Sequence, residues 1–254
     1  MSRSKTKGRV SFLRHSGWVG PENLRDTLTI IGCGAVGSNV AVLAAKMGWT
    51  RFSLWDNDLV EDHNLANQAF DVHHIGMPKV QALEEVLKRF NPAIQVTTHN
   101  EFFTPESEVE EAGPMVIATD TMSSRAEIME AVEYDVDVDH VFETRLGFDF
   151  GIVNVVNNSS ADDLEQWRAT LRDDSEVPDG PCNQRMCTTL VWATASHLVH
   201  TLCSKYAAEK AKKPWVYSTR GFFTLRTHLQ TYHPCDEEEI SSSETTTDNE
   251  QTAS

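Results

Sequence analysis

Residues 27–48, "TLTIIGCGAVGSNVAVLAAKMG", place a glycine-rich turn between a predicted strand and a predicted helix. The apolar run before the turn has the composition of a buried strand, and the residues after it are apolar at a helical spacing until Gly48. Gly32, Gly34 and Gly37 complete a G-x-G-x-x-G pattern. In such a turn the first glycine permits the tight bend, the second lets a phosphate approach the backbone, and the third lets the helix pack on the strand.

The same alternation of strand and helix continues downstream. Further strands are predicted at 51–56, 94–99, 114–120, 140–147 and 151–157, and helices at 77–92, at 123–134 with a serine cap, and at 187–213. This order predicts an α/β fold, a Rossmann-like and mostly parallel sheet flanked by helices. The polar stretch 158–186 predicts a long loop with one helix around Leu164–Leu171. Two closing strands, 215–220 and 222–232, predict a mixed or antiparallel C-terminal extension.

Composition narrows the class of protein. Hydrophobic residues make up 40% of the 254, which is enough for a buried core, and no apolar run approaches the ~18 residues of a membrane span. The basic N-terminus is not followed by an apolar stretch, so we do not expect a secretory signal. Five cysteines, an odd number, do not form a disulfide framework and favour a reducing, cytoplasmic compartment. A net charge of −16 argues against a nucleic-acid partner.

The stretch "LWDNDLVEDHNLANQAF", residues 54–70, follows the second predicted strand and is rich in acids and amides. Asp56 lies nineteen residues after Gly37, where a carboxylate can accept hydrogen bonds from ribose hydroxyls. This arrangement fits two classes of enzyme. One is a nicotinamide-dependent dehydrogenase, and the other uses ATP on a Rossmann-like sheet.

Further polar residues favour the ATP-dependent class. A dehydrogenase needs one acid at this strand end, whereas here Asp58, Asn64 and Gln68 accompany Asp56. Lys79 follows, and a lysine there suits the charge of a triphosphate. Ligands of open α/β sheets bind at the carboxyl ends of strands. Asp120, at the end of the fourth predicted strand, would therefore face the same crevice and could hold Mg²⁺.

Several motifs together resemble the ThiF/MoeB/HesA superfamily. The segments "GCGAVGSN", "DNDLVEDHNLANQ", "IGMPKVQAL", "FNP" and "ATDTMSSR" stand in the order and spacing of that family, and the resemblance covers roughly residues 10 to 145. It implies an ATP- and Mg²⁺-dependent adenylyltransferase. Such an enzyme attaches AMP to the C-terminal glycine carboxylate of a small β-grasp protein, a ubiquitin-like or sulfur-carrier protein ending in Gly-Gly, and releases pyrophosphate.

The resemblance also implies roles for single residues. The glycines of the turn and Asp58 would belong to the nucleotide site, Asp56 would hold the ribose, Asp120 would bind Mg²⁺, and three residues would contact phosphates: Asn64, Gln68 and Lys79. The family uses an arginine from an N-terminal segment that reaches across a homodimer, and "FLRHSGWVG" places Arg14 in that position.

The resemblance divides the chain into three parts. Residues 1–26 form an N-terminal arm. Residues 27–230 form the adenylation domain, with a nucleotide-binding half of about 27–145 and a carrier-binding half of about 146–230. Residues 231–254 form an acidic tail, and we expect it to be disordered because its last nineteen residues carry seven acids and no base.

Asn67 departs from the family pattern. The family has an arginine before the glutamine of this loop, whereas this chain has "NLANQ". A neutral amide cannot replace a phosphate-binding guanidinium. Either another cation compensates, or the protein is a weak or inactive member. We expect Arg14 to be the compensating cation, with Arg25 or Arg125 as the alternatives.

Two cysteines are candidates for a covalent step. Some family members transfer the activated protein to a cysteine in the place of Cys182, in "DGPCNQ"; Cys187, in the first turn of the next predicted helix, is the second candidate, and a thiol without a role is the alternative. The pairs Cys182/Cys187 and His233/Cys235 lack the spacing of a zinc knuckle, which argues against zinc.

Three other functions stay open from the sequence. A nicotinamide oxidoreductase would share the glycine turn and Asp56. A non-catalytic subunit would bind a β-grasp partner without turning over ATP. A tRNA-modifying relative is the third, although the acidic body disfavours it.

Overall fold

One seven-stranded sheet forms the centre of the protein. The computed structural model describes residues 10–109, 111–147, 150–176 and 187–224. Within them the sheet has the strand order β3-β2-β1-β4-β5-β6-β7. Its strands are β1 (Leu28–Ile31), β2 (Arg51–Trp55), β3 (Gln95–His99), β4 (Gly113–Ile117), β5 (Val138–Leu146), β6 (Phe150–Asn157) and β7 (Arg220–Thr224).

The sheet is parallel from β3 to β5 and antiparallel beyond. Strand β1 pairs in parallel with both β2 and β4, and β6 pairs antiparallel with β5 and β7. The Rossmann-like, mostly parallel sheet with an antiparallel C-terminal extension is thus confirmed. Because β1 lies between β2 and β4, the residues that follow these three strands meet at one edge.

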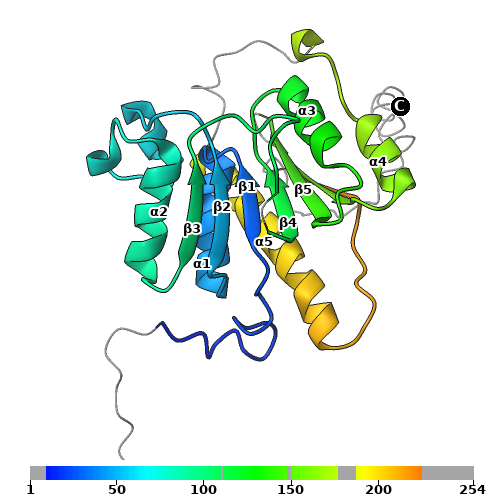
Figure 1. Cartoon of the computed structure of the whole chain (residues 1–254), viewed down its shortest axis with the longest axis horizontal. Helices are drawn as coiled ribbons and strands as arrows, with labels where there is room; N and C mark the ends of the chain where they lie inside the picture. The colour runs from blue at the N-terminus through cyan, green and yellow to red at the C-terminus, as the bar shows by residue number, and fades with distance from the viewer. Residues whose placement is uncertain (1–9, 110, 148–149, 177–186, 225–254) are drawn as a thin grey trace, which may run out of the picture.

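Helices cover both faces of the sheet (Figure 1). One hydrophobic cluster joins the sheet to α1 (Ala35–Met47), α2 (Lys79–Phe90) and α5 (Thr188–Lys210). A second cluster joins the opposite face to α3 (Met122–Val132) and α4 (Ala161–Arg168). Three short 3₁₀ turns lie in the connections: η1 (Asp62–Ala66), η2 (Val72–His74) and η3 (Asp174–Glu176).

Local signals fix the ends of the helices, with two differences from the sequence prediction. Gly48 ends α1 in the left-handed conformation, with φ of +118°. Thr121, rather than a serine, caps α3 by accepting the Ser124 N–H at 3.2 Å. The strand predicted at 215–220 is wrong, because the chain has no regular structure from Pro214 to Ser218 and β7 begins only at Arg220.

The N-terminal arm crosses the C-terminal half of α5. The Trp18 ring stacks on His200 with 4.9 Å between centroids, and Lys210 Nζ donates to the Ser16 carbonyl at 3.0 Å. At the end of the arm, Tyr206 donates its hydroxyl proton to Asp26 Oδ2 at 2.8 Å. Figure 1 shows the arm beneath the amino ends of the strands, at the opposite edge from the glycine turn.

Among the described residues, no helix combines the length and the apolar character that a membrane span requires.

Candidate functional site

Packing requires glycine at two positions of the turn after β1. Gly32 has φ of +91°, and a Cβ there would lie 2.7 Å from the Ala118 carbonyl oxygen. A Cβ on Gly37 would lie 1.8 Å from the Gly32 carbonyl oxygen. A Cβ on Gly34 would meet nothing within 4 Å. The backbone at Gly34 therefore faces open space, which is what close approach of a phosphate requires.

The N-terminus of α1 offers its amides to that space. Gly34 is the N-cap residue, and as a glycine it has no side chain to accept the first-turn N–H groups. The first turn also contains no acidic residue. The first N–H groups of a helix have no acceptor within the helix, and the helix dipole adds partial positive charge there. These residues fit a bound phosphate.

Asp56 is fixed beside the glycine turn. Its Oδ2 accepts the Cys33 N–H at 2.7 Å and its Oδ1 accepts the Asp58 N–H at 2.9 Å. The side chain is 8% exposed, and burial raises its pKa above the ordinary value while the charge of Lys79 opposes that rise. Two backbone donors thus hold the carboxylate in a single orientation at the end of β2.

Lys79 lies against this carboxylate and its neighbour. Its Nζ is 2.6 Å from Asp58 Oδ2 and 4.0 Å from Asp56 Oδ1, and the lysine side chain is only 9% exposed. The Lys79 N–H also donates to the Asp58 carbonyl at 2.9 Å. The start of α2 is therefore bound to the loop after β2, and a buried ammonium lies at the edge of the glycine turn.

The amide-rich loop forms a folded turn rather than an open ligand surface. Asn64 Oδ1 accepts the Glu61 N–H at 2.9 Å, and the Gln68 N–H donates to the Asn64 carbonyl at 2.9 Å. Within the described part of the chain, Gln68 Oε1 is buried and has no hydrogen-bond partner. Asn64 thus shapes the loop, whereas Gln68 retains an unused acceptor.

Two residues of α1 that the sequence reasoning missed hold this loop. Ser38 Oγ accepts the Ala69 N–H at 3.0 Å. Asn39 Nδ2 donates to the Asn67 carbonyl at 2.9 Å and to the Ala35 carbonyl at 2.7 Å. Polar side chains early in an otherwise apolar helix were the available signal. The backbone of Asn67 thus has a structural partner, whatever its side chain does.

Asp120 lies on the other side of the glycine turn. It follows β4 and is exposed, and the Ala118 N–H before it donates to the Ile31 carbonyl at 2.8 Å. On the opposite flank, the Gly32 N–H donates to the Trp55 carbonyl at 2.8 Å. The predicted residues Asp56 and Asp120 therefore flank the glycine turn at one edge of the sheet.

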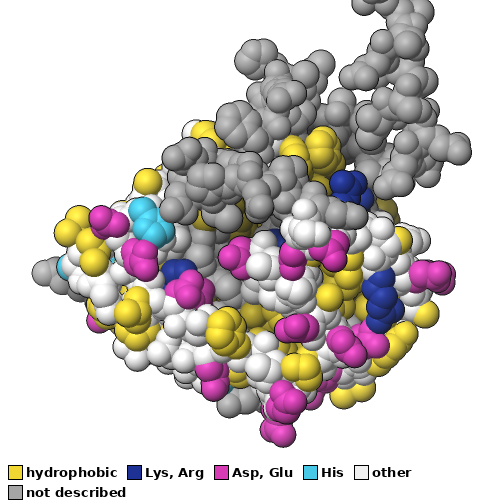
Figure 2. All heavy atoms as spheres, turned by 90° about the horizontal axis from the view of Figure 1, so that it is seen from above, with side chains coloured by type: hydrophobic (Ala, Val, Ile, Leu, Met, Phe, Trp, Pro, Cys, Tyr) yellow, Lys and Arg dark blue, Asp and Glu magenta, His cyan; other side chains and the backbone are white. Residues whose placement is uncertain are grey.

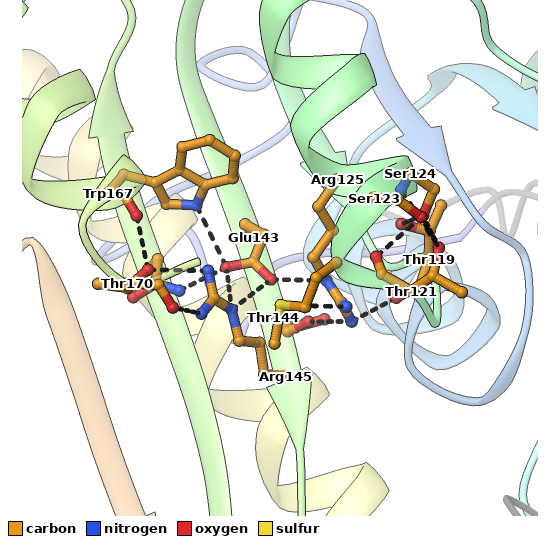
Figure 3. A network of polar contacts seen from close by, with 12 residues as sticks. Thr119, Thr121, Ser123, Ser124, Arg125, Glu143, Thr144, Arg145, Trp167 and Thr170 are labelled. Atoms are coloured by element: carbon orange, nitrogen blue, oxygen red, sulfur yellow. Dashed lines mark hydrogen bonds and ion pairs between the residues drawn. The ribbon is translucent and has the colours of Figure 1, made fainter. Parts of the chain in front are cut away.

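A buried ionic network lies beside Thr119, the residue before Asp120 (Figure 3). Glu143 is fully buried, and its carboxylate binds Arg125 Nε at 2.8 Å and Arg145 Nε at 3.0 Å. Arg125 donates from Nη2 to the carbonyls of Thr119 and Thr144. Burial lowers the pKa of Arg125, and the Glu143 charge opposes that change. Arg125 thus fixes the backbone of Thr119, the residue before Asp120, and its guanidinium is engaged within this network.

Arg14 and Cys182 are not brought to this edge by the described structure. Arg14 is an exposed residue of the arm. The arm packs on Gly48, where Pro21 is its neighbour, and the length of α1, about 20 Å, separates Gly48 from Gly34. Cys182 lies outside the described residues, as do His233, Cys235 and the acidic tail.

Cys187 does lie near the amide-rich loop. It is the exposed N-cap residue of α5, and the neighbouring Thr188 donates its hydroxyl proton to the Ala66 carbonyl at 2.9 Å. Hydrogen bonds from Thr189 lower the pKa of the Cys187 thiol. By contrast, burial raises the pKa of Cys33 well above its ordinary value and that of Cys203 to about 12.

A histidine cluster at η2 has metal-ligating residue types, but the guanidinium of Arg89 already contacts it. Asp71, His73 and His74 place potential ligand atoms within 4.8 Å of one another. Arg89 donates to Asp71 Oδ2 at 3.2 Å and lies 2.7 Å from His73 Nε2. His74 Nδ1 accepts the Asp71 N–H at 2.9 Å, so its Nε2 carries the proton. The cluster is a poor metal site.

Solved structures share the fold. Escherichia coli MccB with ATP superposes with a TM-score of 0.62 at 16% identity, covering 84% of this chain and 64% of that one. Escherichia coli tRNA N6-threonylcarbamoyladenosine dehydratase, TcdA, superposes with a TM-score of 0.59 at 18% identity, covering 76% of this chain and 91% of that one. At these identities the likeness establishes the fold alone.

Sequence comparison with named relatives gives matches over shorter stretches of the chain. The chain is 37% identical over 99 residues to ubiquitin-like modifier-activating enzyme 5 of Branchiostoma floridae and 39% identical over 74 residues to that of Gallus gallus. These matches cover 38% and 29% of this chain, and 24% and 19% of those relatives. The ThiF family model matches residues 22–239. The chain therefore belongs to the ThiF family.

Proposed function

We propose that the protein is an ATP- and Mg²⁺-dependent adenylyltransferase that activates the C-terminal carboxylate of a ubiquitin-like or sulfur-carrier β-grasp protein. The observation that carries this proposal is the edge of the sheet at which the open Gly34 backbone lies between Asp56 with Lys79 on one side and Asp120 on the other. Two likenesses support the same class: the relatives in sequence are ubiquitin-like modifier-activating enzymes, and MccB, which shares the fold, was solved with ATP.

Each group at this edge suits one part of the nucleotide. The first-turn amides of α1 bind a phosphate, and Asp56 accepts hydrogen bonds from the ribose hydroxyls. Lys79 turns its ammonium from Asp58 toward the phosphates, and Gln68 Oε1 accepts a hydrogen bond from the ligand or from a water molecule bound to it. Asp120 and the nucleotide phosphates would hold Mg²⁺, which neutralises charge on the leaving pyrophosphate.

The local charge explains why a metal ion would be needed. Figure 2 looks onto this end of the molecule and shows acidic side chains spread over it, with isolated basic ones. The whole chain carries a net charge of −16. ATP alone would be repelled by such a surface, whereas a magnesium complex carries less negative charge.

The reaction would form one bond and break another at the α-phosphorus. An oxygen of the substrate's C-terminal carboxylate attacks this phosphorus, the bond to the bridging oxygen breaks, and pyrophosphate leaves with the electron pair. The product is an acyl-adenylate. We expect a β-grasp partner ending in Gly-Gly, a homodimer in which Arg14 serves the partner's site, and transfer to Cys182 or Cys187 as a later step.

Pyrophosphate exchange into ATP, in the presence of a β-grasp protein encoded beside this one, tests the proposal. Wild-type protein is expected to exchange, and Asp120→Ala to abolish exchange. Lys79→Met should weaken MgATP binding at least about tenfold by calorimetry, because a charged hydrogen bond is lost. Lys88→Met, on the exposed side of the same helix where Lys88 pairs with Glu84, is the matched control and should bind normally.

Asn67 favours one alternative, a ThiF-family subunit that binds a β-grasp partner without turning over ATP. It stands in place of the family arginine. Arg125 cannot supply the missing charge to a phosphate, because its guanidinium already binds Glu143 and the Thr144 carbonyl in the buried network. Binding of the partner with no exchange by wild-type protein would establish this alternative. Thermal stabilisation by NADH but not by MgATP would instead favour an oxidoreductase.

A further inference from the structure

The end of the amide-rich loop, residues 66–69, is held from two helices. On the α1 side, Asn39 donates to the Asn67 carbonyl and Ser38 accepts the Ala69 N–H. Ser38 is fully buried, so its side chain has little freedom to follow a moving loop. One side of the loop end is therefore fixed to the helix that begins at the glycine turn.

The second hold on the loop comes from α5. The Thr188 hydroxyl donates to the Ala66 carbonyl at 2.9 Å. Thr188 is the first residue of α5, and Leu190 and Val191 just after it are fully buried against the sheet together with α1. The start of α5 is therefore a rigid support, and it reaches the loop from the side opposite to the α1 contacts in sequence.

The turn of the loop has its own local contacts. Asn64 and Glu61 close η1 through a reciprocal capping box, and the Gln68 N–H donates to the Asn64 carbonyl at 2.9 Å. The contacts from α1 and α5 fall instead on residues 66–69, at the end of η1 and beyond. They therefore determine where the loop end lies relative to the two helices, rather than whether the turn forms.

Gln68 lies between the held residues and has a polar atom without a partner. Its Oε1 is buried and accepts no hydrogen bond within the described structure. A buried acceptor that stays unpaired costs free energy, so we expect this atom to obtain its partner from a bound ligand. Because the backbone is held at Ala66, Asn67 and Ala69, those contacts also set the direction of the Gln68 carboxamide.

We propose that Thr188 is a positioning residue of the nucleotide site, whose hydroxyl holds Ala66 so that Gln68 directs its carboxamide at the bound nucleotide. This inference rests on the proposed function, because it takes MgATP as the ligand that Gln68 contacts. Thr188 touches no part of the nucleotide and acts through the backbone of the loop. The first turn of α5 thereby serves nucleotide binding, although it is far from the glycine turn in sequence.

Calorimetry of MgATP binding to the full-length protein tests this role. Thr188→Val keeps the shape of the side chain and removes its donor, and it should weaken binding about twofold to tenfold, the range of one neutral hydrogen bond. Thr188→Ser restores the donor and should recover most of this loss. Thr189→Val is the matched control, because it makes the same change one residue away, where the hydroxyl contacts Cys187 Sγ at 2.8 Å. It should bind MgATP like wild type.

A double-mutant cycle separates positioning from general support of the fold. Gln68→Ala should weaken MgATP binding by itself. If Thr188 acts through Gln68, adding Thr188→Val to Gln68→Ala should cost much less than Thr188→Val costs alone. Independent losses that multiply in the double variant would mean that Thr188 only supports the fold, and would overturn the proposal. Normal binding by Gln68→Ala, no recovery in Thr188→Ser, or an equal loss in Thr189→Val would overturn it as well.

Failure of this role and failure of the proposed function are distinguishable. If wild-type protein binds NADH but not MgATP, and the variants show the same pattern with NADH, the role of Thr188 stands and adenylation falls. If MgATP binds and pyrophosphate exchange proceeds but Thr188→Val binds MgATP like wild type, adenylation stands and the role of Thr188 falls. If neither nucleotide binds, both proposals fall.

Discussion

The Thr188 hydroxyl donates to the Ala66 carbonyl at 2.9 Å, across 122 residues of sequence, and joins the first turn of α5 to the loop after β2. This contact places Cys187, the N-cap of α5, beside the loop that contains Asn64 and Gln68. A thiol in that position is close to the proposed nucleotide site, and its chemical state can be tested directly.

Iodoacetamide at neutral pH should label Cys187 faster than Cys33 or Cys203. Cys187 is exposed and hydrogen bonds from Thr189 lower its pKa, whereas burial raises the pKa of the other two thiols. Peptide mass spectrometry over a time course measures the rates. Thr189→Val should slow labelling of Cys187 and Thr189→Ser should not. Faster labelling of Cys33 would contradict the described burial.

Glu143→Gln should lower the free energy of unfolding by about 3–5 kcal/mol, because it leaves Arg125 and Arg145 buried without their carboxylate. Urea denaturation measures the loss. Glu84→Gln breaks a surface pair with Lys88 and should cost less than about 0.5 kcal/mol. Similar losses in the two variants would show that the Glu143 network contributes no more than a surface ion pair.

Arg14→Ala should be inactive alone and recover activity in mixed dimers. The arm lies at the opposite edge from the glycine turn of its own chain, so we predict that Arg14 serves the site of a partner subunit. Arg14→Ala and Asp120→Ala subunits, unfolded and refolded together, should show about a quarter of wild-type exchange, since half of the random dimers have one intact site. No recovery would place Arg14 within its own site, and full activity of Arg14→Ala alone would remove it from catalysis.

The free energy of unfolding should fall at low pH, because Asp139 then becomes protonated. Burial would raise the pKa of this carboxyl, but hydrogen bonds from His140 and Lys205 outweigh it and lower the pKa to about 2. A lowered acid pKa stabilises the fold above the unfolded value, 3.8, and the contribution is lost as pH falls from about 4 to 2.

Asp139→Asn measures that contribution. Because the side chain is 42% exposed, we expect a loss of only about 1 kcal/mol at pH 7, shrinking toward zero near pH 2. Urea midpoints at pH 7, 4 and 3 give the difference from wild type. Asp137→Asn, an exposed carboxyl two residues earlier, should show no such trend. A constant difference across pH would assign the loss to packing instead of charge.

The parallel half of the fold was predictable because its signals are local. The glycine turn, the stop at Gly48 and the acid after β2 each depend on a few neighbouring residues. The failed strand at 215–220 contains Trp215 and Tyr217, which have high strand propensity. Here their rings stack on each other at 4.3 Å, and Trp215 donates to Ser204 Oγ on α5. Packing across the fold outweighed local preference.

The site was predictable only where a strand end defined it. Asp56 and Asp120 follow β2 and β4, and the parallel sheet brings them to one edge. Asn39 and Asp174 act through backbone groups of distant segments, the Asn67 carbonyl and the Met122 amide. No spacing in the sequence encodes such pairings, since they depend on where a loop returns to a helix.

The contacts of the arm also have a consequence for the order in which the chain can fold during synthesis. The arm is made long before its partners on α5: Tyr206 follows Asp26 by 180 residues, and Lys210 follows Ser16 by 194. At a translation rate of roughly 5–20 residues per second, the arm waits at least about 10 s for this helix. The strands and helices from β1 to α3 can form in that interval, whereas docking of the arm must be among the last steps of folding.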